Sequence, residues 1–230
     1  MFKSIHPFDQ SLVEEFQELS ASELKFKIDS AARAFLHWKK TSFVQRCDLM
    51  MKVAGVLRLN KEKYAQAITR EMGKIISEAR TEVDKCAAGC EFFARQAENF
   101  LADEIIQTES KKSLIAYQPI GAVLAIMPWN FPFWQVFRFA APALMAGNVG
   151  LLKHAPNVTR CALMIEEIFR DAGFPEGVFQ SLLIDVDKVE NVIASPIVQG
   201  IALTGSERAG AEVGAIGGRN IKKTVLELGG

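Results

Sequence analysis

The stretch "GAVLAIMP", residues 121–128, decides the fold, because it is a continuous apolar run without polar alternation. A strand of this kind is covered on both faces, which is typical of a parallel sheet between two layers of helices. A helix candidate over residues 133–146 follows and stops at Gly147, a residue type common just after a helix. These residues therefore predict one strand and its crossover helix.

The same pattern of strand and helix continues to the end of the sequence. Four more apolar runs follow: "VGLLK" (149–153), "GVFQSLLI" (177–184), "VQGIAL" (198–203) and "KTVLEL" (223–228). Helix candidates lie between them over residues 159–172, 186–194 and 206–216. Five strands joined by helical crossovers predict an α/β fold, with a five-stranded, doubly wound parallel sheet over residues 119–230.

The N-terminal part, residues 1–102, has a different pattern and is predicted to be helical. "SASE" at 20–23 places Ser and Glu at the spacing of a capping box. Apolar residues then recur at steps of three and four, at Leu24, Ile28, Ala31, Phe35 and Trp38. Further helices are expected from Phe43 to Leu57, from about Asn60 to Gly73, and over roughly residues 77–101.

Residues 103–118 interrupt the helical pattern and are predicted to form a bridging arm. Their centre, "SLIAY" (113–117), has the composition of a strand, but no neighbouring run in the sequence is an obvious partner. A strand without a partner presents unpaired backbone groups. We therefore expect this strand to pair with another segment or another chain.

Charge and composition exclude several classes of function. The 27 basic residues balance the 27 acidic ones, so no net field favours nucleic acid or an anionic membrane. The most apolar stretch, "IGAVLAIMPW" (120–129), has about half the length of a membrane span, and the N-terminus lacks the apolar core of a signal peptide. Cys86 and Cys90 lie four residues apart in a helical pattern, but the three histidines are far from this pair, so we expect reduced core thiols, no metal site and a cytoplasmic protein.

Polar residues stand where the predicted strands end, which is where open parallel sheets bind ligands. They are Asn130, Lys153 with His154, Asp185, the turn Thr204-Gly205-Ser206, and Glu227. Each also has a local structural explanation. Asn130 could cap the following helix, Lys153 could be a solvated strand end, and Ser206 could be an ordinary helix cap.

Glu227 is flanked by two leucines in the fifth run. If it is buried there, its pKa should be raised, which suits a general base; the alternative is a solvent-facing position on an edge strand. The usual dinucleotide fingerprint, G-x-G-x-x-G, is missing. The agreement of these residues on one edge nevertheless predicts a nucleotide site.

Five motifs in order together resemble the aldehyde dehydrogenase superfamily. They are "IMPWNFP" (126–132), "GN…LLKHAPN" (147–157), "AGFPEGVF" (172–179), "TGS" (204–206) and "VLELGG" (225–230). With "ITREMGK" (68–74), the second motif is most similar to the bacterial NAD(P)-dependent succinate-semialdehyde dehydrogenases. The resemblance runs from about residue 25 to the end of the sequence.

The resemblance implies a role for each matching residue. Asn130 would hydrogen-bond the developing oxyanion, and Glu227 would activate the water that releases the acid product. The cofactor, NAD or NADP, would be contacted by Met127, Pro128, Trp129, Lys153, His154, Pro156, Gly177, Gly205, Ser206 and Leu228. Within this set, Lys153 would reach the ribose, Gly177 the adenine side, and Gly205 with Ser206 the pyrophosphate.

Two departures from the family pattern change what is expected. Many members carry a glutamate three residues after the lysine, where this sequence has Pro156, so we expect NADP to be accepted along with NAD. The nucleophilic cysteine would lie downstream of Glu227 in a catalytic domain that is absent here, and none of the four cysteines matches it. We therefore expect residues 1–230 alone to be inactive on aldehydes.

Other functions stay open at this point. The chain could be a non-catalytic NAD(P)-binding or interaction module, or a truncated gene product. A homo-oligomer could form through the strand at 113–117, since members of the family that the sequence resembles form dimers or tetramers.

Overall fold

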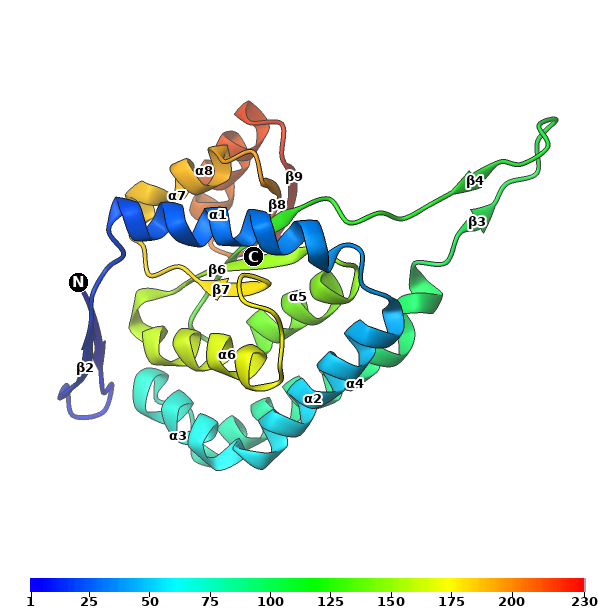
Figure 1. The fold of residues 1–230 in the computed structure, drawn as a ribbon. Coiled ribbons are helices and arrows are strands. Elements are labelled where there is room, and N and C mark those ends of the chain that lie inside the picture. The colour runs from blue at the N-terminus through cyan, green and yellow to red at the C-terminus, as the bar shows by residue number, and fades with distance from the viewer. Residues whose placement is uncertain (230) are drawn as a thin grey trace.

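A five-stranded parallel sheet forms the centre of the computed structural model, which describes residues 1–229 (Figure 1). Its strands lie in the order β7–β6–β5–β8–β9. Their bounds are Ala122–Met127 for β5, Val149–His154 for β6, Phe179–Ser181 for β7, Val198–Gly205 for β8 and Lys223–Leu228 for β9. The apolar run at residues 121–128 forms β5, the middle strand, so the predicted sheet is confirmed.

β7 is shorter than its apolar run predicts. Gly177 has a φ of +85°, so the chain is not extended there. Pairing with β6 covers only three residues, and beyond Ser181 the chain turns, with the amide of Ile184 donating to the carbonyl of Leu182 at 3.0 Å. Only the middle of the apolar run therefore forms a strand.

Helices cover both faces of the sheet, as a doubly wound fold requires (Figure 1). The crossovers are α5 (Trp134–Met145), α6 (Thr159–Asp171), α7 (Val189–Ala194) and α8 (Glu207–Arg219), with short 3₁₀ turns η1 (Pro156–Val158) and η2 (Val186–Lys188). α5 and α6 lie on one face, and α7 and α8 on the other. The predicted crossover helices are confirmed with shifts of a few residues at their ends.

The N-terminal helices form an additional layer on the sheet. They are α1 (Ala21–Trp38), α2 (Phe43–Leu59), α3 (Lys61–Met72) and α4 (Ile76–Phe100). Capping boxes start α1 at Ser20 and α2 at Ser42, and Gly73 ends α3 in the left-handed conformation with φ of 80°. α1 crosses the sheet on the side of α8, whereas α2, α3 and α4 pack beneath α5 and α6.

A column of aromatic rings joins this helical layer to the crossover helices. The ring centroids of Tyr64 and Phe133 are 5.5 Å apart, and those of Phe133 and Phe137 are 6.2 Å apart. The column continues through Phe169, 5.5 Å from Phe137, to Phe174, 5.2 Å further on. All five rings are buried, so they contribute both apolar burial and ring contacts to one continuous core.

Two antiparallel hairpins lie outside the sheet. The N-terminal hairpin, β1 (Phe2–Ile5) with β2 (Leu12–Phe16), packs on η1 and α6 and was not predicted. The arm pairs β3 (Glu104–Ile105) with β4 (Leu114–Ile115) and projects away from the body (Figure 1). The expectation that the arm strand lacks a nearby partner is therefore wrong within the chain, although the pairing covers only two residues of each strand.

Within residues 1–229, no helix combines the length and the apolar composition that a membrane-spanning helix needs.

Candidate functional site

The carboxyl ends of four neighbouring strands, β6, β5, β8 and β9, lie within one residue of each other, which brings the residues that follow them to one edge. The sheet register places four strand-end residues in one row, in the order His154, Met127, Thr204 and Glu227. Lys153 stands one position earlier in its strand, and successive side chains of a strand point to opposite faces. The side chains of Lys153 and Glu227 therefore emerge on opposite faces of the same edge.

Asn130 lies in the loop between β5 and α5. Its side chain is exposed, and its Oδ1 accepts a hydrogen bond from the amide of Phe131 at 3.1 Å. It does not cap α5, because the N-cap position is Phe133, three residues later. The capping explanation is thus excluded. The side-chain nitrogen Nδ2 of Asn130 makes no hydrogen bond with any residue that the structure describes.

The neighbours of Asn130 form the rest of this loop. Met127 is buried at the end of β5, Pro128 is partly covered, and Trp129 is half exposed. These three residues lie at the predicted cofactor edge. Their contact with a cofactor stays a prediction.

Lys153 is a buried cation at the end of β6. It is 8% exposed, and within residues 1–229 its ammonium group has neither a hydrogen bond nor an ion pair. Burial lowers the pKa of Lys153, and the negative charge of Asp185 opposes that shift. Asp185 is exposed, with its carboxylate accepting from the amide of Val186 at 2.7 Å.

Asp185 lies near Lys153 at this edge, as its place directly after the third apolar run predicts. The family resemblance, however, gave it no role. Pro156, in turn, is exposed at the start of η1, where it provides no carboxylate. The acidic group near Lys153 is therefore that of Asp185, which follows β7.

His154 has both ring nitrogens occupied by backbone groups. Its Nδ1 accepts from the amide of Ala155 at 2.8 Å, so its Nε2 carries the proton and donates to the carbonyl of Pro132 at 2.8 Å. Burial lowers the pKa of His154 to about 4, which keeps the ring neutral. His154 therefore fixes the Asn130 loop to β6.

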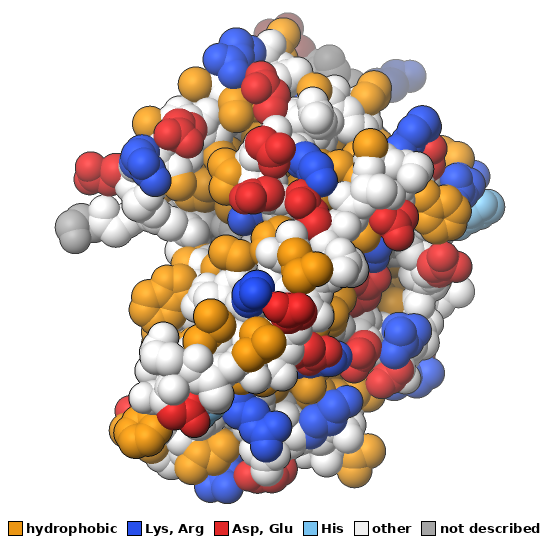
Figure 2. All heavy atoms as spheres, turned by 90° about the vertical axis from the view of Figure 1, so that its left-hand side faces the viewer, with side chains coloured by type: hydrophobic (Ala, Val, Ile, Leu, Met, Phe, Trp, Pro, Cys, Tyr) orange, Lys and Arg blue, Asp and Glu red, His pale blue; other side chains and the backbone are white. Residues whose placement is uncertain are grey.

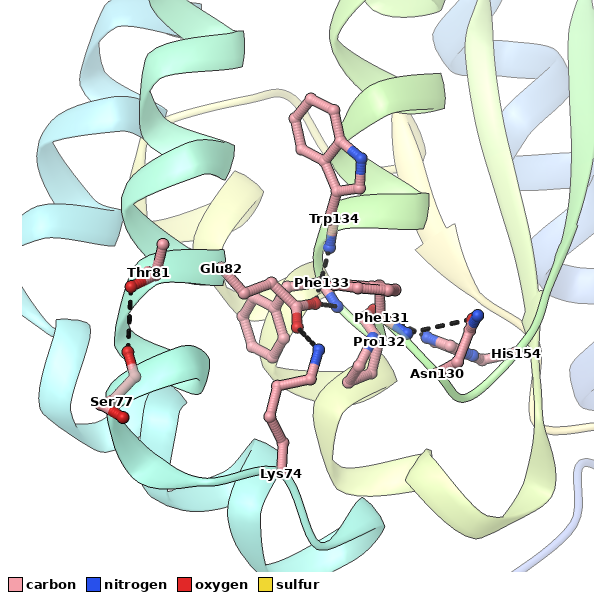
Figure 3. A network of polar contacts seen from close by, with 10 residues as sticks. All are labelled: Lys74, Ser77, Thr81, Glu82, Asn130, Phe131, Pro132, Phe133, Trp134 and His154. Atoms are coloured by element: carbon pink, nitrogen blue, oxygen red, sulfur yellow. Dashed lines mark hydrogen bonds and ion pairs between the residues drawn. The ribbon is translucent and has the colours of Figure 1, made fainter.

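The three long crossover helices, α5, α6 and α8, differ in the partners of the first backbone amides at their N-termini. The carboxylate of Glu82 accepts from the amides of Phe133 and Trp134 at the start of α5 (Figure 3), and Glu71 does the same for Arg160 and Cys161 at the start of α6. Their first amides are therefore already satisfied.

At α8, only Ser206 caps the helix, with its Oγ accepting from the amide of Ala209 at 3.3 Å. The first amides of α8, at Glu207 and Arg208, have no partner among the described residues, and they follow the turn at Gly205. A helix N-terminus with free amides attracts anions. Of the three helices, α8 is the one that can offer its amides to a phosphate.

Glu227 occupies the solvent-facing alternative. It lies on the edge strand β9, its side chain is 48% exposed, and it pairs with Arg138 of α5. Thr204 also donates to its Oε2 at 3.3 Å. Glu227 is not buried between the two leucines, because Leu228 turns to the opposite face and packs beside Gly210 of α8.

A groove of about 390 Å³ runs along the sheet beside Glu227. Its walls are mostly apolar and include Met127, Phe139, Pro142 and Val225. Arg138 and Glu227 supply its charged end, and the sequence reasoning missed Arg138, because it lies inside a helix and not after a strand.

Gly177 is not brought to this edge. It precedes the start of β7, so it lies at the opposite end of the sheet from Asn130 and Glu227. A Cβ on Gly177 would lie 2.7 Å from the carbonyl oxygen of Ser30. The close approach of α1 and the positive φ at this position require a glycine by themselves.

The face shown in Figure 2 carries acidic and basic side chains in mixture, with hydrophobic side chains between them. Among residues 1–229, no group of three or more His, Cys, Asp or Glu residues is arranged to hold a metal ion.

The comparison with known proteins decides the family. The sequence profile described as "Aldehyde dehydrogenase family" matches residues 1–230. The chain belongs to the aldehyde dehydrogenase family. The resemblance seen in the sequence is thereby confirmed.

Among curated aldehyde dehydrogenases, a probable succinate-semialdehyde dehydrogenase [NADP(+)] of Synechocystis sp. is 52% identical over 227 residues, which cover 99% of this chain and 50% of that protein. The succinate-semialdehyde dehydrogenase [NADP(+)] of Mycobacterium leprae is 46% identical over 230 residues, again with 99% and 50% coverage. The chain therefore spans about half the length of the curated relatives it matches.

Solved structures of the family agree with the fold. The succinic semialdehyde dehydrogenase of Streptococcus pyogenes, solved in complex with NADP⁺, superposes with a TM-score of 0.97 at 37% identity and covers 100% of this chain and 51% of that one. A structure of Gox0499, solved to explain its selection of cofactor and substrate, superposes with a TM-score of 0.98 at 38% identity. The match covers 100% of this chain and 50% of that one.

Most cysteines of this aldehyde dehydrogenase chain are enclosed in the core. Cys86, Cys90 and Cys161 are fully buried, and burial raises the pKa of each thiol. A buried thiol with a raised pKa is a poor nucleophile. Cys47 is partly covered on α2, in the helical layer.

Proposed function

We propose that this chain is the cofactor-binding half of an aldehyde dehydrogenase that uses NADP or NAD and oxidises succinate semialdehyde or a similar aldehyde acid. The observation that carries the proposal is the level edge of the sheet, which gathers Asn130, Lys153, the free amides of α8 and Glu227. The names of the relatives support the substrate and the cofactor.

The described residues fit a dinucleotide. Lys153 is a buried cation that has no partner among residues 1–229, which suits ribose hydroxyls or a 2′-phosphate. The amides of Glu207 and Arg208 suit the pyrophosphate. Because Lys153 and Glu227 emerge on opposite faces, a cofactor held by Lys153 and α8 crosses the edge before it reaches Glu227.

Two residues carry the proposed chemistry of this half. NAD(P), when bound, supplies the hydride acceptor. The free amide nitrogen of Asn130 would donate to the aldehyde oxygen as it gains charge. Glu227 would take the proton of the water that releases the acid, and its exposure at 48% gives that water access.

Arg138 supports an aldehyde that carries a carboxylate. Its guanidinium is 38% exposed at the charged end of the groove, next to Glu227. Arginine binds carboxylates through two parallel hydrogen bonds. A dicarboxylic semialdehyde would place its acid group on Arg138 and its aldehyde towards Asn130.

The setting and assembly belong to the same proposal. Four unpaired thiols support a cytoplasmic location. The exposed arm β3–β4, with Ile105 at 71% and Ile115 at 47% exposure, supports a homo-oligomer formed through the strand at 113–117.

The proposal is tested by titrating the purified chain with NADP and with NAD in a calorimeter. We expect saturable binding that weakens roughly tenfold or more in Lys153→Ala, since a hydrogen bond to a charged group contributes about 1.5–3 kcal/mol. Lys25→Ala, which removes an exposed lysine of α1, serves as the control. A folded chain that binds neither cofactor would contradict the proposal.

A further inference from the structure

An ion pair is buried between the helical layer and the Asn130 loop. Lys74, in the turn between α3 and α4, pairs with Glu82 of α4, and their side chains are 7% and 1% exposed (Figure 3). Burying two charges is costly, and apolar side chains of similar volume often serve stability equally well. Stability alone therefore does not account for this pair.

The second oxygen of Glu82 reaches the loop itself. Its Oε1 accepts from the amide of Phe133 at 2.9 Å and from the amide of Trp134 at 3.0 Å. α5 has no side-chain cap of its own at this end. A carboxylate at a helix N-terminus satisfies free amides and opposes the helix dipole, so Glu82 fixes where α5 begins.

Lys74 holds the loop from a second direction. Its ammonium nitrogen lies 3.7 Å from the centroid of the Phe131 ring, within the range of a cation–π contact. Because the same ammonium pairs with Glu82, one ion pair holds Phe131, Phe133 and Trp134 together.

Asn130 depends on these contacts for its position. Its own side chain is exposed and makes only the local bond to the amide of Phe131. Each of the next residues is held by a side chain from elsewhere: Phe131 by Lys74, Pro132 by His154, and Phe133 and Trp134 by Glu82.

We propose that the Lys74–Glu82 pair is a positioning unit for Asn130, which keeps the Asn130 amide aimed at the reacting oxygen. The inference rests on the proposed role of Asn130. Lys74 and Glu82 do not touch the cofactor or substrate in this scheme; they act through the loop. The helical layer thereby sets the geometry of a group at the edge of the sheet.

The chain contains a matched control for Glu82. Glu71 of α3 is as buried, at 3% exposure for both residues, and it also accepts from two amides at the start of a crossover helix, at 2.9 and 2.8 Å. Its helix is α6, which does not follow Asn130. Glu82→Ala and Glu71→Ala therefore remove the same kind of contact at two places.

The experiment measures amide exchange and ¹⁵N relaxation by NMR on the purified chain and both variants. In Glu82→Ala we expect exchange at Phe133 and Trp134 to become about tenfold faster, the factor that a lost cap of ordinary strength gives. In the same variant, the backbone ¹⁵N order parameter of Asn130 should fall from about 0.85 to below about 0.6. In Glu71→Ala the same positions should keep their wild-type values, with faster exchange at Arg160 and Cys161.

Glu82→Gln carries the test if the alanine variant fails to fold. It keeps one acceptor oxygen but loses the charge, so exchange at Phe133 and Trp134 should become about fivefold faster. An unchanged order parameter at Asn130 in a folded Glu82 variant, or an equal loss in Glu71→Ala, would overturn the proposal.

NADP titration of the same samples separates the two hypotheses. If the wild-type chain binds no cofactor, the proposed function fails, while the NMR result still decides whether the pair positions the loop.

Discussion

At the scale of single residues, the structure separates groups that the sequence placed together. Lys153 and His154 are neighbours at the end of β6, and both were predicted to meet the cofactor. Lys153 keeps a free ammonium group, whereas both nitrogens of His154 are used by backbone groups. Sequence alone could not distinguish them, because the difference depends on where the carbonyl of Pro132 lies.

The buried, neutral His154 predicts a loss of stability in acid. Its folded pKa of about 4 lies below its unfolded value of 6.5, so the unfolded chain takes up a proton first as pH falls. Stability from this residue is complete above pH 6.5 and declines between 6.5 and 4. Between pH 7 and pH 5 the decline should be about 2 kcal/mol.

Urea unfolding at several pH values checks this, with His154→Gln as the comparison. The variant should be less stable at pH 7 but should show a shallower decline towards pH 5. An equal decline in both proteins would assign the acid sensitivity to other groups.

At the scale of elements, two explanations of Gly177 can be compared. The resemblance implied a contact with the cofactor, whereas the structure shows a close contact with α1. An alanine there would have to adopt a φ of +85° and would place its Cβ 2.7 Å from the backbone of α1. The expected loss in unfolding free energy is about 2–4 kcal/mol, from the left-handed conformation and the steric clash. Cofactor affinity should be unchanged, because Gly177 lies at the far end of the sheet.

Thermal unfolding and NADP titration of Gly177→Ala measure both quantities. Gly55→Ala is the control, since nothing lies within 4 Å of its added Cβ and alanine favours the interior of α2. A weaker affinity for NADP in a folded Gly177→Ala would restore this glycine to the cofactor site.

Most elements could be predicted because each had a local signal in the sequence: a continuous apolar run, a periodic apolar pattern or a capping motif. The runs that became β5 and β9 and the capping box at Ser20 are examples. The caps of α5 and α6 could not be predicted, because Glu82 and Glu71 lie about 50 and 90 residues before the amides they accept from. Contacts over such separations have no local signature in one sequence.

At the scale of the whole molecule, the arm β3–β4 is the segment most separated from the core (Figure 1). Its outward side chains include Ile105 and Ile115, and both outer edges of this two-stranded sheet are unpaired among the described residues. An exposed edge of this kind is a template for pairing with another chain. We expect the purified chain to self-associate through it.

Sedimentation velocity over a range of concentrations tests this expectation. Ile105→Lys with Ile115→Lys should shift the distribution towards monomer, whereas Leu59→Lys, a substitution at another exposed apolar residue on α2, should not. If the wild-type chain is monomeric at every concentration, the arm does not mediate association of the purified chain.

The two glutamate caps also limit how this protein can be divided. Residues 119–229 contain every strand of the parallel sheet and look like a transferable module. Transplanted alone, however, they would carry α5 and α6 without Glu82 and Glu71, and the aromatic column would lose Tyr64. The smallest portable cofactor unit therefore begins no later than α3, so chimeras of this family should be joined before residue 61.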